Sequence, residues 1–106
     1  MQNLIIVGII TKELEYRMTE QGNSLVKITV RVPSQRKDEQ GRRVSDFFEC
    51  SAWGKTALFI NEYFRKDMQI AIQASLHNHR YIKDGVTVYT YNILINKADF
   101  VPSIKS

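Results

Sequence analysis

Residues 45–55, SDFFECSAWGK, constrain the fold more than any other stretch because their side chains alternate in character. A β-strand places successive side chains on opposite faces. Every second residue from Phe48 to Ala52 is apolar, as expected for a strand that faces a core. The intervening side chains combine two large aromatic groups with a carboxylate and a hydroxyl: Phe47, Trp53, Glu49 and Ser51. Large aromatic groups on an otherwise polar face indicate a binding surface. This stretch therefore predicts a strand whose outer face binds a ligand or a partner.

Length and composition indicate one small basic domain. The chain has 106 residues, of which 43% are hydrophobic, so it can bury a real core. Its formal net charge is +4 and its pI is about 9.3. Such an excess suits a polyanionic partner, although many small basic proteins bind nothing anionic. The single cysteine, Cys50, excludes an internal disulfide, and its strand position favours a small core residue over a nucleophile.

The N-terminal run at residues 4–11 is apolar on both faces of the strand that it predicts, so we expect burial on both sides. Gly8 interrupts the run, which indicates a bend or bulge. A bent first strand that serves both halves of a small barrel would explain the two features together. The run has no basic segment ahead of it and is too short to span a bilayer, so we expect an intracellular protein without membrane contact.

A second strand is predicted at residues 25–33, where β-branched residues alternate with Lys27, Thr29 and Arg31. Pro33 is expected to end it, because proline cannot donate to a strand ladder. The polar residues 12–23 before it predict a connection with a turn at residues 21–23. The charged residues 34–43 after it form either a solvated hairpin tip or a flexible basic finger that wraps a phosphate backbone.

A short helix is predicted from about residue 56 to residue 66. Its apolar stripe is expected in the core, and it follows helical spacing: Thr56, Phe59, Ile60, Tyr63 and Phe64. Arg65 and Lys66 would complement the dipole of the last turn. Residues 68–81 then predict a fourth strand, with these side chains inward: Ile70, Ile72, Ala74 and Leu76. Asp84 and Gly85 predict a hairpin turn into a fifth strand at residues 87–96.

The expected order is therefore β-β-β-α-β-β, which predicts an all-β fold: a five-stranded OB-fold barrel with one short helix between strands three and four. We expect this domain to cover residues 1–101 and a short C-terminal extension to cover residues 102–106. A flat five-stranded sheet with one covering helix is the alternative. It would expose long edge strands, which natural proteins avoid.

The sequence does not carry an enzyme's patterns, so we predict no catalysis, no metal and no cofactor. His77 and His79 share a strand face, but no further ligand stands at a partner spacing nearby. A nucleophile elbow and a phosphate-cradling glycine loop are both missing from the sequence. Asp46 and Glu49 lie on opposite faces of one strand and form no carboxylate pair.

Aromatic groups interleaved with cations are what a single-stranded nucleic acid requires. Its bases expose their π-faces, and stacking one on an aromatic side chain is worth roughly 1–3 kcal/mol. The predicted stacking residues are Phe47, Trp53 and Tyr81. The predicted phosphate-backbone contacts are Lys27, Arg31, Arg36, Arg42, Arg43, Lys55 and Arg80. From the residues alone, a subunit interface filled by the three aromatic side chains remains an open alternative.

Five segments, in order and spacing, carry a resemblance to a known family: LIIVGIITKELEYR, VKITVRV, DFFECSAWGK, NEYFRKD and LHNHRYIKDGVTVYTYNI. From residue 3 to about residue 101 the chain resembles the bacterial and phage-type single-stranded DNA-binding proteins. The resemblance implies an OB-fold, sequence-tolerant binding of single-stranded DNA and assembly into homotetramers. Phe47, Trp53 and Tyr81 match the family's base-stacking aromatics, and Phe48 falls where the family commonly makes subunit contacts.

The chain also departs from that family at several positions. Arg36 stands where the family often has an aromatic residue in the long hairpin, and Leu14 replaces a turn proline. Asp67 replaces the glycine after the helix, so it must adopt a left-handed conformation or the helix must end differently. The chain stops at VPSIKS without an acidic tail, so we expect no recruitment of repair proteins through such a tail.

We therefore predict a cytoplasmic, nucleoid-associated protein that protects exposed single strands during DNA replication, recombination or repair. A homotetramer is expected, with a dimer as the alternative. The rival prediction is a primosome-type accessory protein that bridges single-stranded DNA and protein partners. An RNA-binding module is a third reading, since stacking does not distinguish ribose from deoxyribose.

Overall fold

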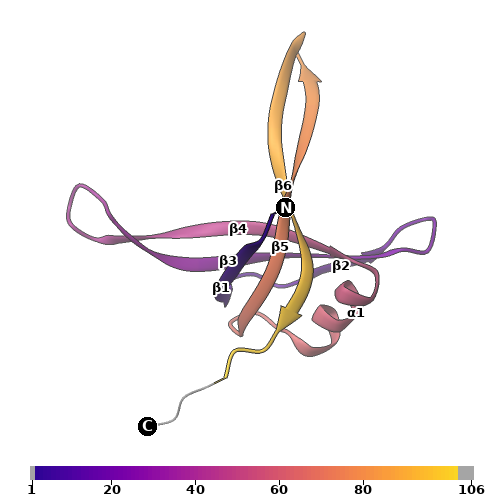
Figure 1. The fold of residues 1–106 in the computed structure, drawn as a ribbon, viewed down its shortest axis with the longest axis horizontal. Coiled ribbons are helices and arrows are strands. Elements are labelled where there is room, and N and C mark those ends of the chain that lie inside the picture. The colour runs from indigo at the N-terminus through magenta and orange to yellow at the C-terminus, as the bar shows by residue number, and fades with distance from the viewer. Residues whose placement is uncertain (1, 103–106) are drawn as a thin grey trace.

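The computed structural model describes residues 2–102, which form six strands and one helix. In chain order these are β1 (Leu4–Ile10), β2 (Glu15–Met18), β3 (Ser24–Lys37), β4 (Arg43–Trp53), α1 (Gly54–Tyr63), β5 (Gln69–Lys83) and β6 (Val86–Asp99). The sheet runs β1-β5-β6-β4-β3-β2, and a further pairing of β1 with β3 closes five of its strands into a barrel (Figure 1). The predicted barrel with one short helix between its third and fourth strands is confirmed.

Strand β1 closes the barrel because it pairs with two strands in succession. Leu4 to Ile9 pair with β5, whereas Ile9 and Ile10 pair with β3. At Gly8 the backbones of β1 and β3 approach so closely that a Cβ atom would lie 2.3 Å from the carbonyl oxygen of Arg31. The predicted sharing of β1 between two halves of a barrel is confirmed, and the glycine is required by this close approach.

The predicted burial of β1 on both faces is wrong for the single chain. Ile6 and Ile10 are buried, but the side chains of Ile5 and Val7 are 60% and 49% exposed. A barrel strand turns only one face inward, so alternate residues face outward whatever their polarity. The outer face of β1 is therefore an apolar surface of the protomer.

The core lies inside the barrel and under the helix. Strand β3 contributes Val26, Ile28 and Val30, and every one of these side chains is almost fully buried. Helix α1 packs against β3, β4 and β6, and it adds Ala57 and Ile60 to the same cluster. The remaining core residues come mostly from β1, β4, β5 and β6: Ile6, Ile10, Cys50, Ala52, Phe64, Ile70, Ile72, Ala74, Ile95 and Ala98.

Two connections differ from the prediction. The polar residues 12–23 contain strand β2, which pairs with β3 and is exposed at all four positions, so it has no apolar alternation to reveal it. Pro33 does not end the following strand, because β3 continues to Lys37. Pairing with β4 is irregular between Pro33 and Lys37, and a bulge tolerates the N–H that proline lacks.

The predicted charged linker is largely the distal part of the β3–β4 hairpin, and we call residues 33–45 the β3–β4 arm. Its tip is residues 38–42, where a carboxylate oxygen of Asp38 accepts hydrogen bonds from the backbone N–H groups of Gln40 and Arg42, at 3.0 and 2.9 Å. Gly41 adopts a positive φ of 80° at the tip. The side chain of Asp38 therefore organises a defined turn.

The helix begins and ends earlier than predicted, at Gly54 and Tyr63, so Arg65 and Lys66 lie outside its last turn. Arg65 still donates from Nη1 to the carbonyl oxygens of Asn61 and Phe64, both at 2.7 Å. Asp67 has a φ of 75°, so of the two expected alternatives it adopts the left-handed conformation. Of the predicted core stripe, Ile60 and Phe64 are buried and Phe59 packs partly buried against the core, whereas Tyr63 is exposed.

The outer side of the helix carries an aromatic cluster instead. Tyr63 is 51% exposed, and its ring lies 5.3 Å from that of half-buried Phe59. Phe100 stacks on Phe64 with ring centroids 4.8 Å apart, so the chain beyond β6 folds back onto the helix. The aromatic residues of the predicted stripe therefore also anchor the C-terminal end of the barrel domain.

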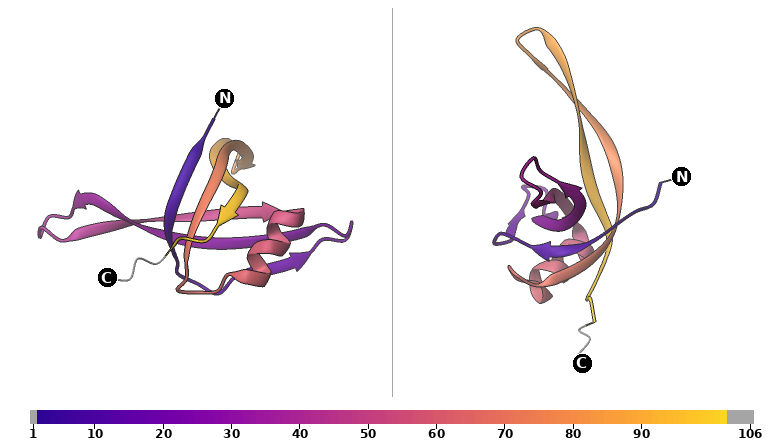
Figure 2. Two further views of the ribbon diagram at one scale, coloured as in Figure 1. Left: turned by 60° about the horizontal axis from the view of Figure 1, so that its bottom comes forward. Right: turned by 90° about the vertical axis from the view of Figure 1, so that its left-hand side faces the viewer.

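Strands β5 and β6 extend beyond the barrel as a second hairpin, and we call residues 76–92 the β5–β6 arm (Figures 1 and 2). Asp84 and Gly85 both have positive φ angles, 51° and 76°, which confirms the predicted tight turn. Leu76 was expected to face inward but is 38% exposed. The register shifts between Gln73 and Ala74, and from Leu76 onward the strand has left the barrel. Residues 103–106, most of the predicted extension, lie outside the described residues.

Candidate nucleic-acid interface

The outer face of β3 and β4 forms one wall of the candidate site. Directly opposite residues of antiparallel strands share a face, and the register pairs Arg31 with Phe47, Thr29 with Glu49 and Lys27 with Ser51. Phe47 is 61% exposed, whereas Cys50 and Ala52 between these positions are buried. The predicted alternation of residues 47–53 is confirmed, and the wall combines an aromatic ring with cations and hydroxyls.

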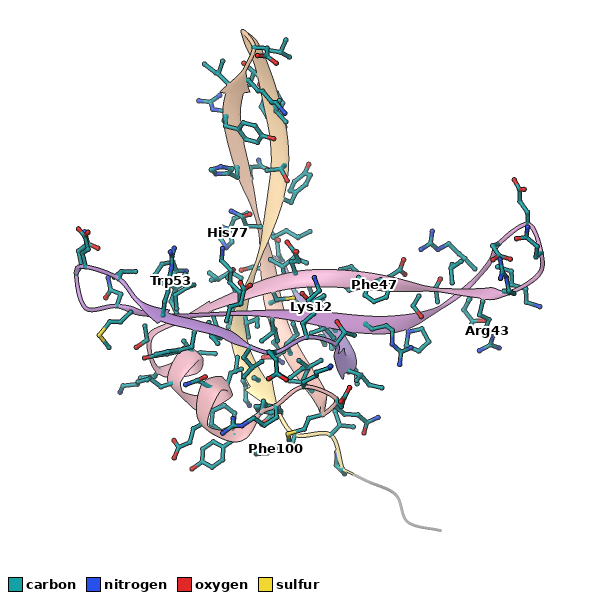
Figure 3. All side chains as sticks on the ribbon, turned by 180° about the vertical axis from the view of Figure 1, so that it is seen from behind. Lys12, Arg43, Phe47, Trp53, His77 and Phe100 are labelled. Carbon is teal, nitrogen blue, oxygen red and sulfur yellow. The ribbon has the colours of Figure 1, made fainter. Side chains whose placement is uncertain are left out.

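Trp53 lies on the same face of β4 as Phe47 but six residues further along, which corresponds to about 20 Å along the strand. Figure 3 shows Trp53 near one end of the β3–β4 ribbon and Phe47 nearer its middle, between Trp53 and Arg43. Trp53 is 46% exposed, and it is also the residue that immediately precedes α1. The two predicted stacking residues of β4 thus mark a path across the barrel.

A cleft separates this wall from β6 and from the connection after β1. It has a volume of about 380 Å³ and is lined by Lys12, Lys27, Glu49 and Tyr91 among others. A neighbouring hollow of about 490 Å³ continues it toward Phe47 and shares Lys12, Glu49 and Tyr91 with it. The cleft is open to solvent and lies between the second and third strands of the barrel and its last strand, where OB-folds bind oligonucleotides.

Two exposed tyrosines of β6 were not predicted as site residues, and one of them, Tyr91, lines the cleft. Tyr89 and Tyr91 are 69% and 66% exposed, and Tyr91 lines both hollows of the cleft. Their signal was present, because aromatic residues two positions apart in a strand share a face. The sequence of residues 87–96 indicated only a strand rich in valine, threonine, tyrosine and isoleucine.

The β5–β6 arm presents different residues on its two faces. Arg80 pairs with Tyr89, and Tyr81 pairs with Val88, so Arg80 and Tyr81 point to opposite faces. Arg80 therefore shares its face with the two tyrosines of β6. Tyr81, which is 46% exposed, instead lies beside His79, with ring centroids 6.1 Å apart. The structure does not bring Arg80 and Tyr81 together on one face, although the two residues border a common hollow at the side of the arm.

The predicted basic contacts fall into two groups. Arg36 forms an ion pair with Asp46, and its Nε donates to the hydroxyl of Ser34 at 3.1 Å. Arg42 is paired with Asp38 at 3.1 Å at the tip of the β3–β4 arm. Within residues 2–102, the other predicted basic residues have no carboxylate within 4.0 Å: Lys27, Arg31, Arg43, Lys55 and Arg80. Lys27 and Arg31 of this second group lie on the wall itself.

Cys50 faces the interior behind the wall. Burial, with a smaller contribution from the neighbouring Glu49 carboxylate, raises the pKa of its thiol to about 12. A thiol that stays protonated at neutral pH is a poor nucleophile and a poor metal ligand. Among the described residues, no group of three potential metal ligands occurs and no helix is long and apolar enough to cross a membrane.

The barrel topology puts the chain in the class of OB-fold barrels, and its wall is both aromatic and basic. Residues 1–101 match the single-strand binding protein family, and the chain belongs to that family. The resemblance stated from the sequence is confirmed. Membership supports the prediction of a single-stranded DNA-binding module rather than an enzyme.

Individual relatives agree with this assignment. The chain is 31% identical over 101 residues to the single-stranded DNA-binding protein of Fusobacterium nucleatum, a match that covers 92% of this chain and 66% of that protein. It is 30% identical over 100 residues to single-stranded DNA-binding protein 2 of Streptococcus agalactiae, with coverages of 94% and 76%. For several relatives, the chain therefore spans about two thirds of their length or less.

Solved structures share the fold. The single-stranded DNA-binding protein of Thermus aquaticus superposes with a TM-score of 0.79 at 19% identity, over 94% of this chain and 50% of that one. The small single-stranded DNA-binding protein of Streptomyces coelicolor gives a TM-score of 0.70 at 15% identity and covers 94% of both chains. The fold thus recurs at low sequence identity.

Proposed function

We propose that this chain binds single-stranded DNA along the β3–β4 wall with little dependence on sequence. The observation that carries the proposal is the exposure of Phe47 and Trp53 on a polar barrel face that also presents Lys27 and Arg31. Solvent-exposed rings stack on bases, and the bases of a single strand offer both π-faces whatever their identity. The cations contact phosphates and release counterions, which makes the binding salt-dependent.

The two arms would extend this surface beyond the barrel. Arg42 lies at the tip of the β3–β4 arm and Arg43 begins β4 directly after it, whereas Tyr81 and Arg80 lie on the β5–β6 arm. Arg80 and Tyr81 point to opposite faces of the arm. DNA that stacks on Tyr81 therefore crosses one face, and DNA that contacts Arg80 crosses the other. Lys55, at the start of α1, would contact the strand beside Trp53.

The ion pair of Arg36 with Asp46 changes what we expect of that residue. A guanidinium already paired with a carboxylate contributes less net charge to a phosphate backbone. We therefore propose that Lys27 and Arg31 carry more of the electrostatic attraction than Arg36. Arg36 can still offer its planar face to a base, since an ion pair leaves that face open.

Tryptophan fluorescence tests the function directly, because Trp53 is the only tryptophan of the chain. The titrants are a thymidine oligomer, its ribonucleotide counterpart and a duplex of equal length, each at low and high salt. We expect strong quenching by the thymidine oligomer alone and weaker binding at high salt. Equal quenching by the ribonucleotide oligomer would favour an RNA-binding role. No quenching by any titrant would remove Trp53 from the site and favour the role of a bridge between protein partners.

We also propose that the chain assembles into a homotetramer, with a dimer as the alternative. The exposed apolar face of β1, with Ile5 and Val7, supports a contact between copies. Covering exposed apolar side chains lowers the free energy of the assembly. Half-buried Phe48 was expected at such a contact and is a second candidate. Analytical ultracentrifugation would give the assembly state. A protein that coats exposed strands in replication, recombination or repair would work at the nucleoid in the cytoplasm.

A further inference from the structure

The hollow between Phe47 and Tyr91 is lined by a carboxylate as well as by aromatic rings. Phe47 comes from β4 and Tyr91 from β6, and both rings are more than 60% exposed. Glu49 lines the same hollow, two residues from Phe47 on the same face of β4. Lys12 and Thr29 complete its polar lining.

A carboxylate is out of place on a surface that only attracts phosphates, since like charges repel. Within residues 2–102, Glu49 has no cation within 4.0 Å, so its charge is not neutralised by a salt bridge. A carboxylate is, however, a strong acceptor of hydrogen bonds from the exocyclic amino groups of bases, as for glutamate with the N4 amino group of cytosine. Its position suits a contact with a base edge better than a contact with the backbone.

We propose that this hollow holds one base next to the rings of Phe47 and Tyr91 and that Glu49 reads the edge of that base. The ligand class is a base with an exocyclic amino group, preferred over thymine or uracil. Uracil and thymine place their N3–H donor between two carbonyl oxygens, whose lone pairs repel a carboxylate. Cytosine offers an N4 amino group with C5–H on its other side. This inference rests on the proposed function and adds a local base preference to an otherwise sequence-tolerant surface.

The test compares end-labelled oligomers of deoxycytidine and deoxyuridine, which differ only at the edge that Glu49 would read. Anisotropy titrations give the affinity ratio of the two oligomers for the wild type and for Glu49→Ala. We expect the substitution to shift this ratio toward deoxyuridine by about threefold to tenfold, the range for the net contribution of one ordinary hydrogen bond. Glu49→Gln should give a similar shift, because an amide can pair with either edge.

Glu13→Ala is the matched control. Glu13 lines the adjoining part of the cleft but not the hollow between the two rings, so it carries the same charge without reaching the base. Its removal should strengthen binding of both oligomers equally and leave their ratio unchanged. A ratio that moves equally in the Glu13 and Glu49 variants would reduce the effect to general electrostatics and overturn the proposal.

The aromatic half of the hollow is tested separately. Tyr91→Ala should weaken binding of both oligomers by at least about fivefold, as expected for loss of one stacking partner. Tyr91→Phe keeps the ring and should bind both oligomers as the wild type does. Tyr63→Ala is the control, because Tyr63 is 51% exposed on the outer side of α1 and lines neither hollow, so its removal should leave both affinities unchanged. If neither oligomer binds the wild type, the proposed function fails as well. If both bind and the ratio is unchanged by Glu49→Ala, only this inference fails.

Discussion

The barrel wall and the β5–β6 arm use the same strand chemistry under different constraints. On the wall, every second residue of β4 is held in the core, so Phe47 and Trp53 are fixed on the opposite face by the packing of Cys50 and Ala52. On the arm, both faces are open to solvent from Leu76 onward, and packing does not decide which face carries which residue. The wall therefore presents a surface that the core determines, and the arm presents two surfaces that only its register determines.

The difference suggests a division of labour in binding. A stacking residue on the wall is positioned by the whole barrel, whereas Tyr81 on the arm depends on the hairpin pairing alone. Substitutions that disturb the barrel should therefore affect stability and binding together. Substitutions on the arm should change binding while the free energy of unfolding stays nearly constant.

The largest effect is expected at Gly8. A Cβ atom there would lie 2.3 Å from the carbonyl oxygen of Arg31 and 2.7 Å from a methyl group of Val30, so the β1–β3 closure would have to open. We expect Gly8→Ala to lower the free energy of unfolding by at least about 3 kcal/mol, measured by urea denaturation. Gly41→Ala is the control, because that arm glycine has open space and only a positive φ. Gly41→Ala should lower the free energy of unfolding by about 1 kcal/mol. Equal losses in the two variants would contradict the closure argument.

The next effect concerns binding alone. Trp53→Ala should weaken affinity for single-stranded DNA by roughly 1–3 kcal/mol while the unfolding curve changes little. The matched control is Tyr63→Ala on the outer side of α1, which removes an aromatic ring of similar exposure, 51% against 46%, away from the wall. It should leave the affinity unchanged. An unaltered affinity in the Trp53 variant would exclude that ring from the site.

The elements that could be predicted from the sequence are those that the core constrains, as on the barrel wall. Strand β4, its two faces and the outward aromatics were predictable, because a core on one side enforces period-two alternation. The path of β3 beyond Pro33 was not, because the sequence shows a missing N–H but not the bulge that accommodates it. Strand β2 was missed because all four of its residues are exposed, so hydrophobicity does not mark it.

The candidate site was predictable in its elements but not in its grouping. Stretches with exposed aromatics point to the right strands, but the pairing of Arg80 with Tyr89 and of Tyr81 with Val88 requires the register of the arm. The ion pair between Arg36 and Asp46 joins residues ten positions apart and becomes visible only once β3 and β4 are paired. That Phe47 and Tyr91 line one hollow depends on barrel closure, which no local pattern encodes.

The barrel interior can also be probed by pH through Cys50. Its thiol has an ordinary pKa of 9.0 when solvated and one of about 12 in the folded chain. Between these values the unfolded state has lost a proton that the folded state retains, so stability falls as the pH rises above 9. At pH 10 the resulting loss of folding free energy is about 1.4 kcal/mol. Cys50→Ala should abolish this part of the pH dependence. Iodoacetamide at pH 8 should leave the native thiol unmodified, and rapid native alkylation would contradict its burial.

The smallest effect separates wall from arm by salt dependence. Lys27→Ala removes a wall cation without a carboxylate partner among the described residues, and the logarithmic salt slope should fall by about 0.7 for one phosphate contact on a single strand. Arg36→Ala removes a charge already paired with Asp46, so its slope should change by less than half as much. An affinity loss in the Arg36 variant without a slope change would mean that its guanidinium stacks on a base. A full slope change would mean that DNA displaces Asp46, and the arm would then contribute charge as directly as the wall.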